Sequence, residues 1–232
     1  MSTISNPEHI NSDMSEFVSV NTNKMKWQPS PSGTVWRKRL HLVGPSETGQ
    51  VTSLVMYEAN ADFHAHAHPG GEEILVLGGT FSDERGDFTA GTYLLNPEGY
   101  EHTPYSKEGG IIFVKLRQYP GDNRKQIVVE TQKMDWEDNS CPGIAVKTLY
   151  CEQNYPEETS LLKWDAGASP GKVVYPGGAE ILILRGNLQD ENGSYGEMSW
   201  LRFPVGAEHT PYSPNGCELY IKRGGISLLD SA

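Results

Sequence analysis

Three histidines, His64, His66 and His68, alternate with alanines in the N-terminal half of the chain. On an extended strand the side chains point alternately to opposite faces, so all three imidazoles lie on one face. Residues 69–71, Pro-Gly-Gly, predict a tight turn, and Glu72 begins an apolar run that is typical of the next strand. The turn therefore brings a carboxylate back to the imidazoles.

A further imidazole comes from a second motif, residues 91–102, in which two glycines and a proline precede His102. Neutral imidazoles combined with one carboxylate suit a divalent transition metal. We therefore predict one such metal (Zn, Fe, Mn or Ni, its identity open), held by His66, His68, Glu72 and His102.

Three more side chains are candidates to support these ligands: His64, Tyr93 and Tyr105. His64 shares the face of the other two imidazoles one pleat further out, so it is either a ligand or a support to the ligands, or it lies at the mouth of a pocket. Tyr93 precedes the proline of the second motif and either packs in the core or lines the pocket. Tyr105 belongs to a block, residues 101–106, that recurs later in the chain, so part of its role is structural.

The chain is internally repeated. With an offset of 107 residues, Thr-Ser-Leu at residues 52–54 returns at 159–161, and Glu-His-Thr-Pro-Tyr-Ser at residues 101–106 returns at 208–213. A match of this length at one constant offset indicates a duplication, so we expect two copies of one structural unit.

The predicted metal site is not repeated. Val173, Tyr175 and Ala179 stand where the first copy has two histidines and the glutamate, and His209 alone survives. One imidazole does not hold a metal well, so we predict that this degenerate second site binds none.

Length and pattern point to an all-β protein of two units. The 232 residues contain many short β-branched and aromatic runs separated by Gly, Pro, Asn and Asp, and no long helical period. We expect a flexible N-terminal tail (residues 1–24), a first unit (25–119), a linker (120–144) and a second unit (145–232).

The formal net charge of −11 argues against nucleic acid as a partner, because phosphate contacts need clustered cations. The short basic stretch at residues 37–39 is interpreted as a solvated strand edge. No apolar run is long enough for a membrane span and no signal peptide is evident, so we expect a cytoplasmic protein with no membrane partner. Three cysteines without paired spacing fit reduced thiols.

Both motifs resemble those of the cupin superfamily. Residues 66–79 match the central part of its His-x-His, Glu and Gly motif, and residues 91–102 match its Gly, Pro-x-Gly and His motif. Asp62 lies nearest the position of the usual initial glycine, and Ser106 replaces the final asparagine; neither is a ligand. Within the superfamily, residues 70–77, 81–88 and 112–117 resemble the ChrR-type group, named after the cupin half of a zinc-binding anti-sigma factor.

The resemblance implies a bicupin, two tandem jelly-roll barrels of which residues 25–119 bind the metal and residues 145–232 form a degenerate copy. It implies a small-molecule ligand and, for an enzyme, a dioxygenase that cleaves a C–C bond of a dicarbonyl or hydroxy-ketone. The alternative is a non-catalytic sensor that responds to metal or ligand. Because no amphipathic helical run precedes the first barrel, we expect no sigma-factor binding. We expect the second barrel to serve the fold, by packing on the first barrel or by forming a homodimer contact.

Overall fold

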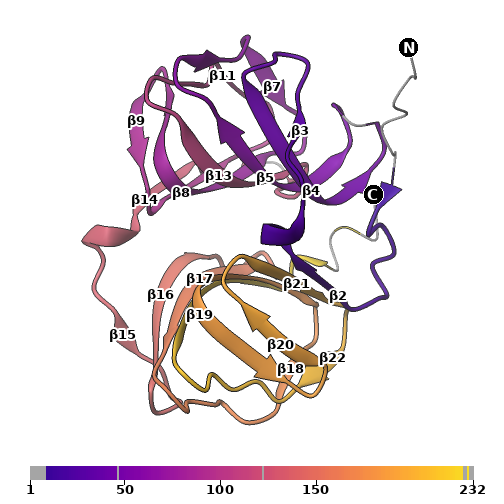
Figure 1. Cartoon of the computed structure of the whole chain (residues 1–232), viewed down its shortest axis with the longest axis vertical. Helices are drawn as coiled ribbons and strands as arrows, with labels where there is room; N and C mark the ends of the chain where they lie inside the picture. Colours follow the sequence, from indigo (N-terminus) through magenta and orange to yellow (C-terminus); the bar gives the residue numbers. More distant parts are fainter. Residues whose placement is uncertain (1–8, 46, 122, 227–228, 230–232) are drawn as a thin grey trace. The chain divides into compact units, whose positions relative to one another are not determined.

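The computed structural model describes residues 9–45, 47–121, 123–226 and 229 (Figure 1). Within these residues the regular structure is β-strand, apart from two short 3-10 turns. None of their helical segments is long and apolar enough to cross a membrane. The expected all-β architecture is confirmed, and the chain divides into two compact units, Met1–Ser12 with Lys26–Gln132 and Asp13–Met25 with Lys133–Ala232.

The first unit has an antiparallel sheet in the order β1-β4-β5-β13-β8-β10-β14 and a separate two-stranded ladder of β7 and β11, which carries the histidine motifs. Its strands are β1 (His9–Ile10), β3 (Gln28–Pro29), β4 (Val35–Val43), β5 (Gln50–Tyr57), β6 (Ala61–Asp62), β7 (His66–His68), β8 (Glu72–Asp83), β9 (Gly86–Thr89), β10 (Thr92–Asn96), β11 (Tyr100–His102), β12 (Tyr105–Ser106), β13 (Gly110–Leu116) and β14 (Ile127–Glu130).

Strand β8 lets this sheet curve around its core. Alternate residues Ile74 and Val76 are buried in the apolar cluster of the unit, as the period-two pattern requires. The register with β13 shifts at Ile111/Ile112, where Gly78 and Val76 lie opposite, and the next residue of β8, Gly79, has a φ of +67°. A Cβ at Gly79 would collide with the carbonyl oxygen of Gly109, so the bend in β8 requires glycine there.

The second unit repeats this design with a sheet in the order β15-β16-β17-β23-β19-β21-β2 and a separate ladder of β18 and β22. Its elements are β2 (Val18–Asn21), η1 (Thr22–Lys24), β15 (Glu137–Asp138), β16 (Ile144–Cys151), β17 (Glu158–Trp164), β18 (Val173–Tyr175), β19 (Ala179–Asp190), β20 (Gly193–Gly196), β21 (Ser199–Phe203), β22 (Ala207–His209) and β23 (Cys217–Arg223). The remaining turn, η2 (Thr131–Lys133), spans the boundary between the units.

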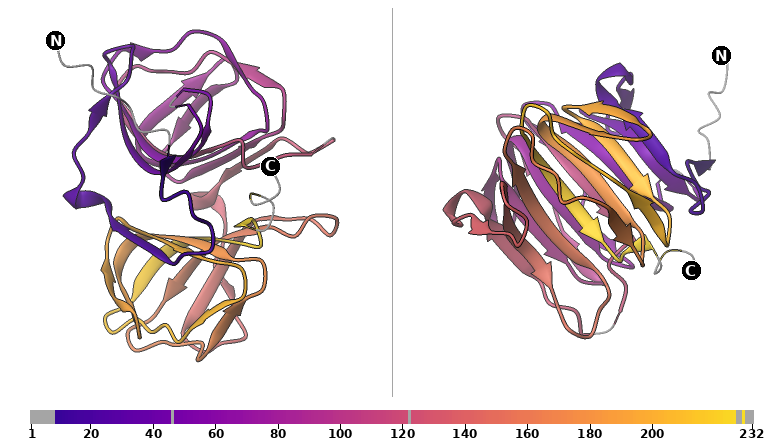
Figure 2. Two further views of the ribbon diagram at one scale, coloured as in Figure 1. Left: turned by 90° about the vertical axis from the view of Figure 1, so that its right-hand side faces the viewer. Right: turned by 90° about the horizontal axis from the view of Figure 1, so that it is seen from below.

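The segments interpreted from sequence as tail and linker form strands and turns in the part of the chain that the structure describes. Strand β2 pairs with β21 in the second unit, and β14 pairs with β10 in the first; Figure 2 shows the indigo segment of β2 beside the orange strands. Residues 18–28 and 127–137 are themselves related, sharing Thr, Lys, Met and Trp at matched positions. The duplication thus begins before the expected boundary of each unit, and residues 1–8 of the predicted tail lie outside the described part.

Phe17, next to β2, generates a prediction about stability. Its ring packs 4.9 Å from that of Phe203 and 6.4 Å from that of Tyr195, against the core of the second unit. Replacing this half-buried ring with a methyl group, Phe17→Ala, should lower the free energy of unfolding by about 2 kcal/mol. Urea unfolding followed by tryptophan fluorescence measures the loss. The neighbouring exposed Glu16→Ala should change it by less than about 0.5 kcal/mol, and equal stability of both variants would contradict the structural role of this segment.

Candidate metal centre

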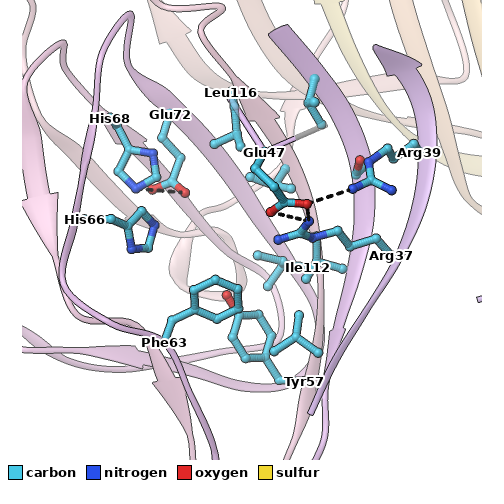
Figure 3. A pocket seen from close by; sticks show the side chains of 15 residues that line it. Arg37, Arg39, Glu47, Tyr57, Phe63, His66, His68, Glu72, Ile112 and Leu116 are labelled. Atoms are coloured by element: carbon cyan, nitrogen blue, oxygen red, sulfur yellow. Dashed lines mark hydrogen bonds and ion pairs between the residues drawn. The ribbon is translucent and has the colours of Figure 1, made fainter. Parts of the chain in front are cut away.

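The ladder of β7 and β11 brings the histidine motifs together. His102 lies directly opposite His66 in the antiparallel register, and His68 shares the face of His66 because it is two residues further along β7. The chain then turns at Gly71, whose amide donates to the carbonyl of His68 at 3.0 Å, and Glu72 starts β8. Figure 3 shows His66, His68 and Glu72 side by side on one wall of a pocket.

The side chains of these residues converge. One ring nitrogen from each of His66, His68 and His102 lies within 4.8 Å of the others, and the Nε2 atoms of His68 and His102 are 2.9 Å apart. The Glu72 carboxylate places Oε1 3.6 Å from Nε2 of His68 and Oε2 3.7 Å from Nε2 of His102. His68, Glu72 and His102 are buried and His66 is half-buried, so the cluster lies inside the barrel.

Hydrogen bonds on the far side of the cluster fix the orientation of three donors, His66, His102 and Glu72. Nδ1 of His66 is 2.8 Å from the carbonyl oxygen of His64, and Nδ1 of His102 is 3.3 Å from Oδ2 of Asp83. Asn96 donates from Nδ2 to Oε2 of Glu72 at 2.9 Å. When Nδ1 donates to these oxygens, the Nε2 lone pairs of both histidines face the centre of the cluster.

Asp83 was not identified from the sequence. Burial acts to raise its pKa, but hydrogen bonds from His102 and Arg85, with the charge of Arg85, outweigh burial and hold the pKa well below its ordinary value. Its carboxylate is therefore ionised and able to accept the proton on His102. The signal was present in the repeat, because Asp190 occupies the matched position and contacts His209 in the same way, at 2.9 Å.

Burial lowers the pKa of His68 to about 4. The nearby Glu72 carboxylate opposes this change, while His102 and His66 act in the same direction as burial. His68 is therefore neutral at physiological pH, which is the form that ligates a metal.

The three supporting candidates lie in different surroundings. The His64 side chain is exposed and lines the outer mouth of the pocket, while its carbonyl holds His66. Tyr93 is fully buried and donates to Glu73 Oε1 at 3.0 Å, in keeping with the core-packing alternative. Tyr105 is half-buried on β12, whose backbone pairs with β6 and β8.

The pocket in front of the cluster holds about 610 Å³ between its side chains, part of it open to solvent. Much of its wall is apolar, with Val35, Val55, Ile112 and Val114 among the residues that line it. Tyr57 also lines the pocket; burial, reinforced by the charge of Glu72, raises the pKa of its hydroxyl. That hydroxyl stays protonated at neutral pH and can donate to a bound oxygen. Tyr57 was not identified from the sequence.

The second unit carries no comparable cluster among its described residues. Val173 lies opposite His209 in the ladder of β18 and β22, and Ala179 is fully buried at the position of the glutamate. The Tyr175 hydroxyl lies 2.9 Å from Nε2 of His209, and Asp190 holds Nδ1. His209 is thus a buried histidine with both ring nitrogens engaged by protein, beside a pocket lined mainly by aliphatic and aromatic side chains.

Comparison with protein families gives a match to the ChrR cupin-like domain over residues 15–120 and again over residues 124–227. No curated protein matches the chain in sequence. Both matched segments begin near the strands that precede each barrel, β2 and β14, which agrees with the extent of the structural repeat.

Solved structures with the same fold include a candidate dioxygenase of Nostoc punctiforme, with a TM-score of 0.73, 14% identity and coverage of 92% of this chain and 84% of that one. The protein Ylba of E. coli has a TM-score of 0.70 at 17% identity, covering 94% and 95%. A variant of oxalate decarboxylase from Bacillus subtilis has a TM-score of 0.60 at 11% identity, covering 92% and 77%. At these identities the likeness establishes the fold.

The bond from His102 to Asp83 predicts how this carboxylate affects metal affinity. Asp83→Asn removes the charge that orients the imidazole and strengthens it as a metal ligand, so the Kd for zinc should rise about 10- to 100-fold. Competition with a chromogenic chelator measures it. The matched control is Asp190→Asn, which breaks the equivalent bond in the second unit and should leave zinc affinity unchanged; equal losses in the two variants would show a general effect on folding.

The lowered pKa of His68 predicts the pH dependence of stability of the metal-free protein. The folded pKa of about 4 lies below the unfolded value of 6.5, so the unfolded chain binds more protons between these values and stability falls as pH falls from about 6.5 to 4. The loss from this group should reach about 3 kcal/mol. Urea unfolding across this range should show a flatter profile for His68→Gln than for His64→Gln, an exposed control, and identical profiles would contradict the assignment.

Proposed function

The chain belongs to the ChrR cupin-like domain family, and from that membership we propose that its first barrel is a metal-dependent centre for a small oxygen-rich molecule. The proposed site holds one divalent transition metal through His66, His68, Glu72 and His102. The proposed reaction is oxidative cleavage of a C–C bond in a dicarbonyl or hydroxy-ketone. The observation that carries the proposal is the convergence of three ring nitrogens within 4.8 Å, beside a buried carboxylate.

The donor set fits a metal of this class. Two Nε2 atoms only 2.9 Å apart repel each other when both are unprotonated, and a cation between the donors relieves that repulsion. The Nδ1 atoms of His66 and His102 are held by oxygen acceptors, an arrangement common for metal-bound histidines. Three imidazoles and one carboxylate suit Zn, Fe, Mn or Ni.

A bound metal of this kind supplies Lewis acidity and, where it is redox-active, a meeting point for substrate and dioxygen. The surrounding side chains supply the remaining functions. The aliphatic wall formed by Val55, Ile112 and Val114 limits the access of water, which strengthens polar interactions inside the pocket. The protonated Tyr57 hydroxyl donates to a ligand oxygen, and Asn96 keeps the Glu72 carboxylate in place.

The structural relatives support the reaction class. A candidate dioxygenase and an oxalate decarboxylase share this fold, and oxalate is a small, oxygen-rich molecule. For this chain the fold is shared and the chemistry is our proposal. A dicarbonyl and a hydroxy-ketone are both uncharged, and each presents two oxygens that can approach the histidine cluster together.

The metal content of two matched variants tests the site. His102→Ala should lose most of the metal, whereas His209→Ala, at the equivalent position of the second barrel, should keep one metal per chain. Elemental analysis after gel filtration gives the ratio. Two tightly bound metals per chain, or equal loss in the two variants, would overturn the assignment to the first barrel. Oxygen uptake by the iron-loaded protein with 2,3-butanedione and acetoin then tests catalysis, and its absence with a full metal complement favours the sensor alternative.

A further inference from the structure

The pocket of the first barrel contains two arginines that the metal centre does not use. Arg37 and Arg39 lie two residues apart on β4, so both side chains point to the same face. That face lines the same pocket as His66 and His68, and Figure 3 shows the guanidinium groups on the side opposite the imidazoles. The side chain of Arg39 is 6% exposed and that of Arg37 16%. The expectation of a solvated strand edge at residues 37–39 is therefore wrong for the inward-facing arginines.

Two guanidinium groups at a largely apolar wall need an anion. Burial lowers the pKa of Arg39, the charge of Arg37 acts in the same direction, and Glu47 opposes both. Arg37 donates from Nη1 to both carboxylate oxygens of Glu47 at 2.7 and 2.8 Å, and Arg39 donates from Nη2 at 3.3 Å. Because one carboxylate faces two guanidinium groups, this cluster of three carries a net positive charge.

Glu47 comes from the loop between β4 and β5, and its side chain is 47% exposed. An ion pair with one partner this exposed contributes little to stability, because solvent screens the attraction between the two charges. The carboxylate can therefore leave the arginines at small cost when another anion takes its place. Figure 3 shows Glu47 reaching into the pocket between the arginines and the wall that carries His68 and Glu72.

The second unit indicates that the arginines serve the site. Arg37 pairs with Val55 on the neighbouring strand, and at the equivalent place in the second unit Val146 pairs with Leu162. Val146 therefore stands where the first unit has Arg37. Thr148 stands in the same way where the first unit has Arg39, because Arg39 pairs with residue 53 and Thr148 pairs with the equivalent residue 160.

Lys38, between the two arginines, is kept as Lys147, and each ammonium lies over a tryptophan ring at 4.3 and 4.5 Å respectively. The loop that carries Glu47 is also two residues longer than its counterpart in the second unit. In the first unit the loop joins the paired residues 42 and 51, and in the second unit it joins the equivalent pair, residues 151 and 158. The lysine is common to both barrels, whereas the arginines and the longer loop occur only with the metal ligands.

We propose that Arg37 and Arg39 bind the carboxylate of a small 2-oxo or 2-hydroxy acid, and that Glu47 is a built-in competitor that occupies this anion subsite in the free protein. The inference rests on the proposed function and changes its substrate class from neutral dicarbonyls and hydroxy-ketones to acids that carry a carboxylate beside the carbonyl or hydroxyl group. Arginine forks match carboxylate geometry in a bidentate manner. The oxygens at the other end of such a molecule would face the histidine cluster.

Pyruvate and 2,3-butanedione are a matched pair of probes, because they have similar size and one carboxylate distinguishes them. Isothermal titration calorimetry on zinc-loaded protein should give a pyruvate Kd at least about tenfold lower than that of butanedione. Glu47→Gln should tighten pyruvate binding about 3- to 10-fold and leave butanedione unchanged. The control Glu58→Gln removes the same charge from an exposed site outside the pocket and should change neither. Inorganic phosphate, a third probe, should bind more weakly than pyruvate.

Arg37→Met and Arg39→Lys test the arginines, the second keeping the charge but losing the fork. Each should weaken pyruvate binding about tenfold or more, with zinc content and butanedione binding unchanged. Repeating the pyruvate titration on metal-free protein separates the two hypotheses, since the arginine dependence should persist there even if no metal binds in the first barrel. Equal binding of pyruvate and butanedione, phosphate binding as tight as pyruvate, or weaker pyruvate binding in Glu47→Gln would overturn the anion subsite.

Discussion

The main constraint on the first barrel is the burial of polar and charged groups where small barrels normally pack aliphatic side chains. The two buried carboxylates of the site have partners that offset the loss of water. Asp83 accepts a hydrogen bond from His102 and forms an ion pair with Arg85. Glu72 accepts a hydrogen bond from Asn96. Asp83 ends β8, Arg85 lies in the turn that follows it, and Asn96 ends β10, so these residues belong to the large sheet or its turn and not to the ladder of β7 and β11. The site is therefore held from outside by the sheet, and the positions of its donors follow from strand register.

The histidine cluster could be predicted because its information is local. Period-two alternation in β7 and the turn before Glu72 fix which side chains share a face, and the structure brings those side chains together. The loss of ligands in the second copy could also be predicted from the sequence, since the constant offset aligns Val173 with His66 and Ala179 with Glu72. What alternation could not supply is the role of residues on other strands. Asp83 lies at the end of β8, and only the three-dimensional pairing places it behind His102.

The pairing of β2 and the inward direction of the arginines were missed for a related reason. The residues of β2 alternate between half-buried and exposed, and such a weak pattern indicates a strand only when its partner β21 is known. A run of three basic residues is usually solvated, yet on a strand its members face opposite sides. Here the outer two point into the barrel and Lys38 packs on Trp27. The three residues share a positive charge, but alternation along the strand places Arg37 and Arg39 on one face and Lys38 on the other.

The duplication acts as an internal control on these assignments. Features needed for folding should persist in both halves, and features needed for the site should be lost together from one. The bend glycine Gly79 recurs as Gly186, where a Cβ would again collide with a carbonyl oxygen, and Asp83 recurs as Asp190. Asp190 still holds a histidine that has no cluster around it, so this bond has a structural component in both barrels. The arginines behave in the opposite way, since both are absent from the copy that lacks the ligands. Their absence there supports the proposed role of Arg37 and Arg39 in ligand binding, and the one arginine among the described residues that lines the second pocket, Arg223, comes from a different strand, β23.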